Sequence, residues 1–546
     1  MQLIQQGQAV SRLAQYLNQH IVGEVSSSTV LRRHYSQDGS VLAIAPELVV
    51  YPRTTNDIRK VTLFARQLAE KGHIVGITPR GAGADQTGAA IGSGIVIDMS
   101  ARLNNIIHVA VKEKFVHAQA GTTTEAINQA LRWHGLRLPG QIDMPYATIG
   151  GMIASQSPRS FTQHLTRLEV ILGNGDVLET GRMNRKEVNR KKGLQTLEGE
   201  IYRKIDAITE DHESIIQTHI RHATPSAVGY PGIADVKKRD GSIDLTPLFI
   251  GSQGTLGVIS EAVIKTAFYS AERVAFLIGT PTLEMGRDLV DGFKALSPAL
   301  LELIDGRLFD VTQKNGKTLS FISADGQAVP GAVVVVCFDD IAEINRKNKF
   351  KKALKLLQRY DGCKVVNSTE RPIEELLSVR EIFARMVLSL DEAESFPPLI
   401  DGAYIPTDRH EEFMRALELL EKKHHITLYH KTDGLSNIVD VRSIMQLQQV
   451  GDKQRVLRLI SDYCELVEQH GGSCISEGGE GRIKANAAWE TIDASLADLY
   501  RQVRHLFDPL GTLNPGVKQV NDQKALIAAL RSHYEPGSIA RYLPYV

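Results

Sequence analysis

The sequence predicts a protein of mixed helices and strands, in the α/β or α+β class, with two or three domains. Strand-like apolar runs and helix-like runs alternate between residues 40 and 180, which is typical of both classes. The chain has 546 residues, of which 42% are hydrophobic, so it can fill more than one ordinary domain core. A glycine-rich loop within residues 78–100 lies between two of the strand-like runs and gives the first indication of function.

The elements follow from hydrophobic periodicity and from capping and turn residues. Residues 1–35 predict an amphipathic helix and a polar joint, whose function the sequence does not indicate. The further elements expected are a strand at 47–51, a helix at 55–71, strands at 73–77, 95–99 and 115–119, a helix at 124–134, a hairpin at 168–178, surface helices and a loop at 182–247, a strand within 249–264, a buried strand at 332–338, and helices near 341–358 and 409–423.

The glycine-rich loop suits a phosphate group, although it lacks the Rossmann pattern. Gly81 and Gly83 are followed by Gln86 where the third glycine of G-x-G-x-x-G belongs, and no helical periodicity appears before Ile95. The order strand, loop, strand therefore predicts a nest of backbone N–H groups rather than a helix N-terminus. An ordinary glycine-rich hairpin fits the same residues equally well. Residues 147–157 (ATIGGMIASQS) form a second small-residue loop, and one ligand that spans both loops would explain the two.

Composition argues against several classes of function. Lys plus Arg and Asp plus Glu number 63 each, so the formal net charge is zero and no overall positive field favours nucleic acid. The four cysteines have neither C-x-x-C nor metal-ligand spacing, which argues against a self-contained iron–sulfur cluster and fits a reducing cytoplasm. Neither a signal peptide nor a transmembrane segment is expected, because no apolar run reaches about 20 residues. Peripheral membrane association stays open.

Four motifs, in this order and at this spacing, carry a family resemblance. They are RGAGADQTGAA at 80–90, ATIGGMIA at 147–154, GSQGTLGVISEA at 251–262 and LFDPLGTLNPGVK at 506–518. Together they resemble FAD-linked oxidases of the vanillyl-alcohol oxidase type, with a PCMH-type FAD-binding domain. The branch most similar to the chain is that of the D-lactate, glycolate and D-2-hydroxyglutarate dehydrogenases. The resemblance covers about residues 40 to 520.

The resemblance implies an α+β fold with an FAD-binding domain of two subdomains, an α/β cap domain and a C-terminal segment that returns to the FAD domain. The boundaries expected are 1–40 for an N-terminal helical extension, 41–270 for the FAD-binding domain, 271–480 for the cap domain that holds the substrate, and 481–546 for the C-terminal segment.

The resemblance also assigns cofactor contacts. The first loop would hold the FAD pyrophosphate, with Arg80 near its charge; the second would line the flavin and ribityl chain, and Ile259 would meet the adenine side through its backbone. The residues so assigned are Pro79, Arg80, Gly81, Ala82, Gly83, Ala84, Asp85, Thr148, Gly150, Gly151, Ala154, Ser155, Gln156, Ser157 and Ile259. Some relatives attach FAD covalently through a histidine in the first loop. Because Ala84 and Asp85 stand there, non-covalent FAD is expected.

Catalysis on a 2-hydroxy acid requires a cation for the carboxylate, a base for the hydroxyl proton and flavin N5 as hydride acceptor. Arg380 matches the family's carboxylate-binding arginine, and a guanidinium suits that task. An ion pair with a local carboxylate such as Glu381 is the alternative. His430 is the best candidate for the base, because the unperturbed pKa of histidine lies near neutrality. A buried structural histidine is the alternative there.

The metal and base motifs depart from the family. The pattern H-x-G-D-G-N-x-H reads HKTDGLSN here, so Asn437 replaces the second histidine. The pattern G-E-H-G-x-G-R reads SEGGEGR, so Gly478 replaces another. A divalent metal is therefore doubtful, with His430, Asn437 and Glu477 as its only plausible partial shell. Glu477 and Arg482 are also catalytic-site candidates, or they form a buried pair that shapes the pocket.

Three functions follow from these residues. The first is an FAD-dependent dehydrogenase or oxidase that removes a hydride from a CH–OH carbon, and the favoured substrate is a 2-hydroxy acid such as D-lactate or a larger D-2-hydroxy acid. The second keeps the flavin but acts on a neutral alcohol, sugar or lactone. The third is a flavin-binding electron-transfer or regulatory subunit with impaired catalysis. In each, the electron acceptor stays open between oxygen, a quinone, a soluble carrier and a partner subunit.

Overall fold

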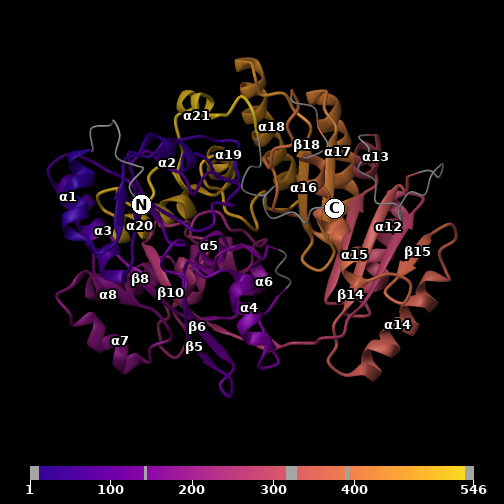
Figure 1. Ribbon diagram of the computed structural model, residues 1–546, viewed down its shortest axis with the longest axis horizontal. Helices are drawn as coiled ribbons and strands as arrows, with labels where there is room; N and C mark the ends of the chain where they lie inside the picture. Colours follow the sequence, from indigo (N-terminus) through magenta and orange to yellow (C-terminus); the bar gives the residue numbers. More distant parts are fainter. Residues whose placement is uncertain (1–10, 141–143, 315–328, 388–389, 391–392, 535–546) are drawn as a thin grey trace, which may run out of the picture. The chain divides into compact units, whose positions relative to one another are not determined.

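The structure is a computed structural model that describes residues 11–140, 144–314, 329–387, 390 and 393–534. It divides into two compact units. The first contains Met1–Ala267 and Ile475–Leu530, and the second contains Phe268–Cys474 and Arg531–Val546. Helices and strands occur in both units, which confirms the α+β class (Figure 1).

A four-stranded sheet lies at the beginning of the first unit. Its order is β1 (Glu24–Ser26), β2 (Leu48–Tyr51), β4 (Ile95–Asp98), β3 (Ile77–Arg80). The pairs β2·β4 and β4·β3 are parallel, so the chain must cross over between β2 and β3, and helix α3 (Thr55–Glu70) makes this connection. A capping box of Thr54 and Asp57 fixes where α3 begins. Helices α1 (Arg12–His20) and α2 (Thr29–His34) precede the sheet's second strand.

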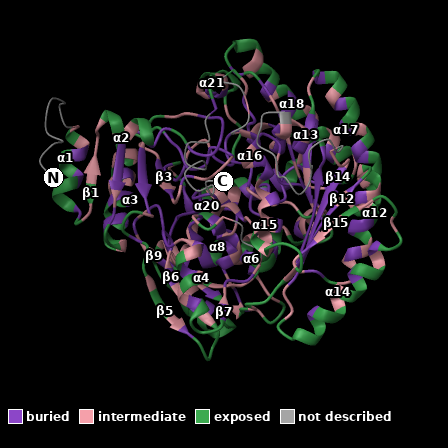
Figure 2. Ribbon diagram, turned by 45° about the vertical axis from the view of Figure 1, so that its right-hand side comes forward, coloured by how far each residue is buried: buried purple, intermediate pink, exposed green. Residues whose placement is uncertain are grey.

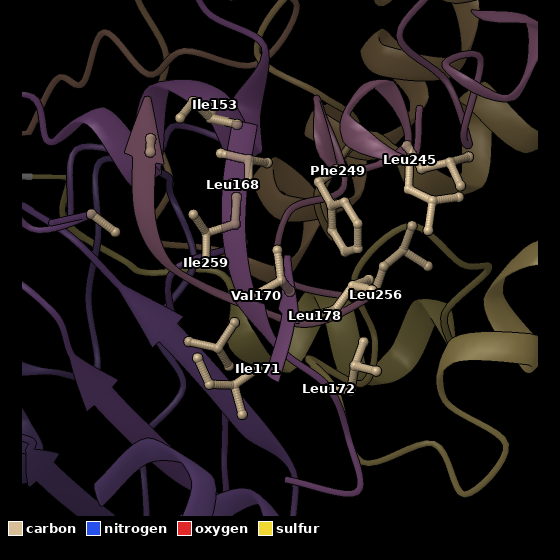
Figure 3. Packing of buried hydrophobic residues seen from close by; sticks show 14 of the residues in the cluster. Ile153, Leu168, Val170, Ile171, Leu172, Leu178, Leu245, Phe249, Leu256 and Ile259 are labelled. Atoms are coloured by element: carbon tan, nitrogen blue, oxygen red, sulfur yellow. The ribbon is translucent and has the colours of Figure 1, made fainter. Parts of the chain in front are cut away.

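A five-stranded antiparallel sheet follows in the same unit. Its order is β5 (Ile106–Ala110), β6 (Phe115–Gln119), β10 (Val258–Lys265), β8 (Leu165–Ile171), β9 (Val177–Glu179). Between these strands lie α4 (Thr124–Arg132), β7 (Leu136–Arg137), α5 (Ile149–Ser155) and α6 (Arg159–Thr162). One buried apolar core spans both sheets. Figure 3 shows the part of this core in which side chains from β8, β9 and β10 meet Phe249 and Leu256.

Helices complete the first unit. From 182 to 249 they are α7 (Arg185–Lys192), α8 (Leu197–Asp211), α9 (Glu213–Ile216), a π-helical turn (Gln217–Arg221), α10 (Ile233–Val236) and α11 (Thr246–Phe249). The returning C-terminal segment adds α19 (Ala485–Thr491), α20 (Ala494–Phe507) and α21 (Gln523–Ala529). Ile77 of β3 donates to Thr512 and accepts from Asn514 through its backbone, so the segment is tied to the first sheet.

The second unit is built on a seven-stranded antiparallel sheet. Its order is β15 (Lys364–Asn367), β12 (Val274–Thr280), β14 (Ala332–Phe338), β13 (Leu300–Asp305), β17 (Leu428–Asp433), β18 (Ile438–Ser443), β16 (Ala403–Tyr404). A short pair, β7 with β11 (Ala267–Phe268), precedes it. Every residue of β14 is buried, whereas α14 exposes one side to solvent (Figure 2).

The two faces of this sheet have separate apolar cores. Helices α12 (Leu283–Lys294) and α14 (Glu343–Leu357) pack on one face, here called the α12 face. Helices α13 (Arg307–Lys314), α15 (Ile373–Leu377) and α16 (Ile382–Val387) pack on the other, the α16 face. Helices α17 (His410–His424) and α18 (Val450–Gln469) also belong to this unit, as do 3₁₀ turns at Ser378–Glu381 and Thr407–Arg409.

Two local predictions are wrong. The strand expected at 73–77 begins only at Ile77, and Ile74 is 65% exposed, because Gly72 with φ +84° ends α3 and the chain then runs along the surface. The second small-residue loop contains helix α5, since Thr148 caps it by accepting from Gly151 N. The hairpin at 168–178, the strand at 332–338 and the helices near 341–358 and 409–423 are confirmed.

Candidate functional site

The loop after β3 presents backbone donors that the protein itself does not use. Among the described residues, the N–H groups of Ala82, Gly83 and Ala84 donate to no protein acceptor. Gly83 has φ +73°, the left-handed conformation that turns successive N–H groups toward one side. The loop is half-buried, and no helix follows it before β4. These features fit a diphosphate such as that of FAD, which needs convergent donors and only small side chains nearby.

Arg80 supplies a buried positive charge beneath this loop. Its guanidinium donates to Ala90 O at 3.3 Å and lies over the ring of Tyr35. Burial lowers the pKa of Arg80, while Asp38, Asp98 and other nearby groups raise it. The Asp38 carboxyl has its pKa raised to about 6, first by burial and then by Asp85. Arg80 thus has several carboxylates of the protein near it, and its guanidinium lies against Gly83 of the loop.

Asp85 shapes the loop. Its Oδ1 accepts hydrogen bonds from Thr87 N at 2.8 Å, from Thr87 Oγ1 at 2.8 Å and from Ala89 N at 2.9 Å. A carboxylate with three donors from its own chain is a turn-forming residue. We therefore expect Asp85 to hold the loop's conformation, while the neighbouring N–H groups bind the anion.

The two loops assigned to FAD lie against each other. A Cβ added at Gly81 would come within 2.1 Å of Thr148 Oγ1, and one at Gly150 would come within 2.7 Å of Ala120 Cβ. The N–H groups of Ile149 and Gly150 donate to carbonyls of Thr122 and Ala120. Gly150 therefore allows α5 to pack closely against Ala120. The N–H groups that remain available for a ligand are those of the first loop.

Replacing Gly81 by Ala tests this close approach. The added methyl group must push Thr148 and α5 away from the first loop, and overpacking of this kind costs about 1–3 kcal/mol. We expect Gly81→Ala to weaken FAD binding roughly 10-fold, measured by titrating apoprotein with FAD and following flavin fluorescence. Gly451→Ala is the matched control, because a Cβ there meets nothing within 4 Å. Equal FAD affinity in the two variants would contradict the prediction.

The end of α5 meets the 251–254 segment, the third of the family motifs. Gly251 N donates to Ile153 O, and Gln253 N donates to Ala154 O, both at 2.9 Å. Gln156 has φ +56°, and Ser155 Oγ donates to Gly151 O. Ser157 N donates to Met152 O. The residues Ala154 to Ser157 thus form a tight helix end in the FAD unit.

Ile259 and Pro79 lie in strands. Ile259 is in β10, pairs with Val170 of β8 and is 7% exposed in the core (Figure 3). Pro79 pairs with Ile97 and touches Gly254. Both positions lie in the unit that carries the first loop. The adenine contact of Ile259 stays a prediction.

Arg482 and Glu477 do not form the buried ion pair that is the alternative to a catalytic role. Arg482 donates to the carbonyls of Gly88 at 3.0 Å, Ile91 at 2.9 Å and Pro515 at 2.6 Å. Glu477 accepts from Arg159 N at 2.9 Å. Arg482 is buried and ties the C-terminal segment to the end of the first loop, so we infer a structural role for it. The catalytic role of either residue stays a prediction.

Arg380 belongs to a buried charged cluster in the second unit. Its Nη2 donates to Glu302 Oε1 at 2.6 Å, and Lys431 Nζ lies 3.2 Å from Glu302 Oε2. Burial raises the pKa of Glu302, but the charges of Lys431 and Arg380 outweigh it and lower the pKa to about 2. Arg380 thus forms an ion pair, as the alternative interpretation predicts, but its partner is Glu302 on β13 rather than the neighbouring Glu381.

His430 lies on the opposite face of the sheet from this cluster. In β17 successive side chains alternate between faces, and Lys431 shares the α16 face with Glu302. His430 instead faces Asp305, with Nε2 3.8 Å from Asp305 Oδ2, and its ring is 1% exposed. Burial lowers the pKa of His430 to about 4. The structure therefore does not bring His430 and Arg380 together.

The residues proposed for a metal do not all belong to one unit. Asn437 Oδ1 accepts from Lys294, and its Nδ2 donates to Thr407. Glu477 belongs to the first unit, whereas His430 and Asn437 belong to the second. Within the described ranges, no group of three His, Cys, Asp or Glu side chains could hold a metal ion.

Asp440 is a candidate that the sequence did not reveal. It is the cross-strand partner of Lys431, so its side chain shares the α16 face with Arg380 and Glu302. Its pKa is raised to about 6, first by burial and then by Asp401. A carboxyl group that titrates near neutrality beside cations is typical of catalytic sites. The sequence alone does not indicate this residue, because only the register between β17 and β18 places Asp440 opposite Lys431.

Comparison with known families agrees with these two units. Residues 46–181 match the model of the FAD binding domain, and residues 270–517 match that of the C-terminal domain of FAD linked oxidases. The two matches define a two-domain flavoprotein. The chain belongs to the FAD-linked oxidases, as its four motifs predict, and FAD is its cofactor.

Named relatives are similar to this chain at modest identity. D-2-hydroxyglutarate dehydrogenase of Pseudomonas putida is 24% identical, over 90% of this chain and 50% of its own length. A glycolate oxidase subunit of Bacillus subtilis is 24% identical over 89% and 92%, and D-lactate dehydrogenase of Archaeoglobus fulgidus is 22% identical over 86% and 90%. The chain spans about half the length of the D-2-hydroxyglutarate dehydrogenases that it matches.

Solved structures share the fold. 4-Ethylphenol oxidase from Gulosibacter chungangensis has a TM-score of 0.66 at 12% identity and covers 95% of this chain and 99% of its own. p-Cresol methylhydroxylase has a TM-score of 0.65 at 11% identity and covers 91% and 95%. These likenesses confirm the PCMH-type fold. No helix in the described ranges has the length and apolarity to cross a membrane.

Proposed function

We propose that this protein is an FAD-dependent oxidoreductase that removes a hydride from the CH–OH carbon of a 2-hydroxy acid. The observation that carries the proposal is a buried charged cluster that contains Arg380, in a chain with an FAD-binding domain. The names of the relatives support the same substrate class, since they act on D-2-hydroxyglutarate, glycolate and D-lactate.

The residues divide the chemistry between them. FAD, when bound, supplies the N5 position that accepts a hydride. The N–H groups of Ala82, Gly83 and Ala84 would hold its diphosphate. Arg380 would bind and orient the substrate carboxylate, since a guanidinium offers two parallel donors. A base on the same face of the sheet would take the hydroxyl proton.

Asp440 is the base that we favour over His430, because it shares a face with Arg380. A base must be deprotonated to act, so activity should rise with pH through the raised pKa of about 6 and fall about tenfold per pH unit below it. Asp440→Asn should remove this acidic limb from the profile of kcat/KM against pH. His430→Leu is the comparison variant. If His430→Leu removes the limb and Asp440→Asn keeps it, the assignment is reversed.

The test of the function itself is anaerobic mixing of the holoprotein with candidate substrates. D-lactate, glycolate and D-2-hydroxyglutarate should each be tried, with L-lactate as a stereochemical control, and flavin absorbance near its long-wavelength maximum should fall with a true substrate. Bleaching by a neutral alcohol or sugar alone would favour the second function. Tight FAD binding without bleaching by any of them would favour an electron-transfer or regulatory subunit.

We also infer that FAD is held without a covalent bond, because Ala84 and Asp85 stand in the loop where attachment by histidine occurs in relatives. Acid precipitation should release all yellow colour into the supernatant. Colour that remains in the pellet would show a covalent link.

The electron acceptor and the location are proposals as well. Oxygen, a quinone, a soluble carrier or a partner subunit can take the electrons, and stopped-flow reoxidation with each class would distinguish them. We propose a cytoplasmic location, with peripheral membrane association open, because no disulfide joins the cysteines in the part of the chain that the structure describes.

A further inference from the structure

We propose that the turn at residues 36–44 is part of the FAD site, where Gly39 holds the first loop in its anion-binding conformation and Asp38 sets the charge beside it. The match to the FAD binding domain begins only at residue 46, so the family model does not assign this turn. Gly39 and Asp38 are positioning residues, because they act through the first loop rather than on FAD directly. The inference goes beyond the proposed function, since it concerns the cofactor and not the substrate.

Hydrogen bonds of the backbone fix the turn in place. Ile44 N donates to Ser36 O at 2.8 Å, which closes the turn. Ala43 N donates to Ala529 O at 2.8 Å, which fastens the turn to the end of α21. The tip carries residues 38–40, with the sequence DGS. The turn therefore presents these three residues from a fixed position.

The tip is buried, although two of its three residues are polar. Asp38 is 6% exposed and Ser40 is 0% exposed. Asp38 Oδ1 accepts hydrogen bonds from Ser40 N at 3.0 Å and from Ser40 Oγ at 2.6 Å. A buried carboxyl group is costly unless its surroundings compensate for the lost water. The first loop and Arg80 contribute to that compensation.

Gly39 contacts the first loop through its backbone. Its N–H donates to Gly83 O at 3.0 Å. In a trans peptide unit the carbonyl and the following N–H point in opposite directions, so this bond turns the N–H of Ala84 away from the turn. That N–H is one of the three donors that we assign to the diphosphate. A Cβ at position 39 would come within 2.8 Å of Ala84 O and 2.9 Å of Asp85 O, so only glycine lets the turn approach this closely.

Asp38 contacts the other end of the first loop. Its Oδ2 accepts from Ala90 N at 3.3 Å, and Arg80 Nη1 donates to Ala90 O at 3.3 Å. Burial lowers the pKa of Arg80, and Asp38 is the carboxylate that opposes this effect most. The guanidinium of Arg80 lies against Gly83. The charge on Asp38 therefore determines how much of the positive charge of Arg80 is left for an anion on the first loop.

The same charge couples FAD binding to pH. The charged groups near Asp38 are Asp85, Arg80 and Arg482. Burial and then Asp85 raise the pKa of Asp38 to about 6. The diphosphate of FAD is also negative, so its binding must raise this pKa further and favour the protonated carboxyl. Asp38 therefore takes up a proton when FAD binds, and FAD affinity falls as the pH rises through the raised pKa.

Replacing Gly39 by Ala tests the backbone contact. Apoprotein is titrated with FAD, and the dissociation constant is read from flavin fluorescence. We expect Gly39→Ala to raise this constant roughly 10-fold or more, since the added methyl group displaces the peptide units of Ala84 and Asp85. Gly23→Ala is the matched control, because a Cβ there comes within 2.2 Å of Tyr51 O, outside the first loop. It should lower the melting temperature of the apoprotein and leave the FAD dissociation constant unchanged.

Replacing Asp38 by Asn tests the charge. The variant keeps an oxygen that accepts from Ser40 but cannot ionise. We expect the FAD dissociation constant of the unmodified protein to rise roughly threefold or more between about pH 5.5 and about pH 8, and Asp38→Asn to lose this rise.

Asp240→Asn is the matched control for the charge, because Asp240 begins a second DGS sequence. Its Oδ1 accepts from Ser242 N at 2.9 Å, but the side chain is 59% exposed. The hydrogen bonds from Ser242 lower the pKa of Asp240 to about 2, so this carboxyl stays ionised throughout the titration. Asp240→Asn should therefore keep the pH dependence of the unmodified protein.

Two results would overturn the proposal in its separate parts. The role of Gly39 fails if Gly39→Ala binds FAD as tightly as Gly23→Ala does. The role of Asp38 fails if Asp38→Asn keeps the pH dependence, or if the unmodified protein shows none. If Gly39→Ala does not fold, Asp38→Asn still decides whether the turn belongs to the FAD site. No substrate enters these titrations, so their result stands whether or not a 2-hydroxy acid reduces the flavin.

Discussion

Replacing Lys518 by Met is expected to destabilise the FAD-binding unit by about 3–5 kcal/mol, because it leaves a buried carboxylate without its cation. Lys518 Nζ lies 2.6 Å from Glu480 Oε2, and both side chains are 0% exposed. Burial lowers the pKa of Lys518, while Glu480 raises it. Glu480 also accepts from Gly229 N, and Lys518 donates to Ala227 O. Urea unfolding monitored by circular dichroism would measure the loss.

A surface pair of the same length provides the control. Lys204 and Glu200 also lie 2.6 Å apart, but they are 57% and 43% exposed on α8. Lys204→Met should cost less than about 0.5 kcal/mol, since exposed pairs contribute little. The double variant Lys518→Met with Glu480→Gln should recover part of the stability. Equal losses for Lys518→Met and Lys204→Met would show that burial of the pair does not determine its effect.

Replacing Arg380 by Met is expected to lower kcat/KM for a 2-hydroxy acid by roughly 30- to 3000-fold. The change removes the charged donor for the carboxylate and leaves Glu302 with Lys431 alone, and losses of one partner in such buried pairs cost roughly 2–5 kcal/mol. Steady-state turnover with an artificial electron acceptor would measure the effect. FAD content should stay unchanged, because Arg380 belongs to the unit without the FAD loop.

Arg307 is the matched control for Arg380. It pairs with Asp305 at 2.8 Å, so it too binds a buried carboxylate of β13, but one on the α12 face. Arg307→Met should lower stability and leave kcat/KM within about threefold. A neutral alcohol that is oxidised equally well by Arg380→Met and by the unmodified protein would shift the proposed substrate away from hydroxy acids.

Much of the fold could be predicted because it depends on local patterns. The run AVVVVCF predicted β14, the Asn-Gly turn predicted the hairpin of β8 and β9, and Thr54 marked the start of α3. The first loop could be recognised by its glycines, since Gly83 requires φ +73°. Residues 73–76 were misjudged because an apolar run of five residues does not show whether a partner strand covers it.

The candidate catalytic site could be predicted only in part, because it depends on register. Arg380 was found by its motif, but its partner Glu302 lies 78 residues earlier in the chain. The face on which His430 lies depends on the pairing of β17 with β13 and β18, and a shift of one residue would reverse it. The same register places Lys431 and Asp440 on the α16 face, where Lys431 contacts Arg380. Sequence spacing alone contains none of this information.

The chain order of the first unit has a consequence for biosynthesis. Its two segments, Met1–Ala267 and Ile475–Leu530, are separated by about 200 residues that fold as the other unit. β3 needs Thr512 and Asn514 as backbone partners, and Glu480 needs Lys518. During translation, the FAD-binding unit therefore cannot complete its fold until residue 530 has emerged from the ribosome. A ribosome stalled before that point should display a protease-sensitive amino-terminal portion that does not retain flavin.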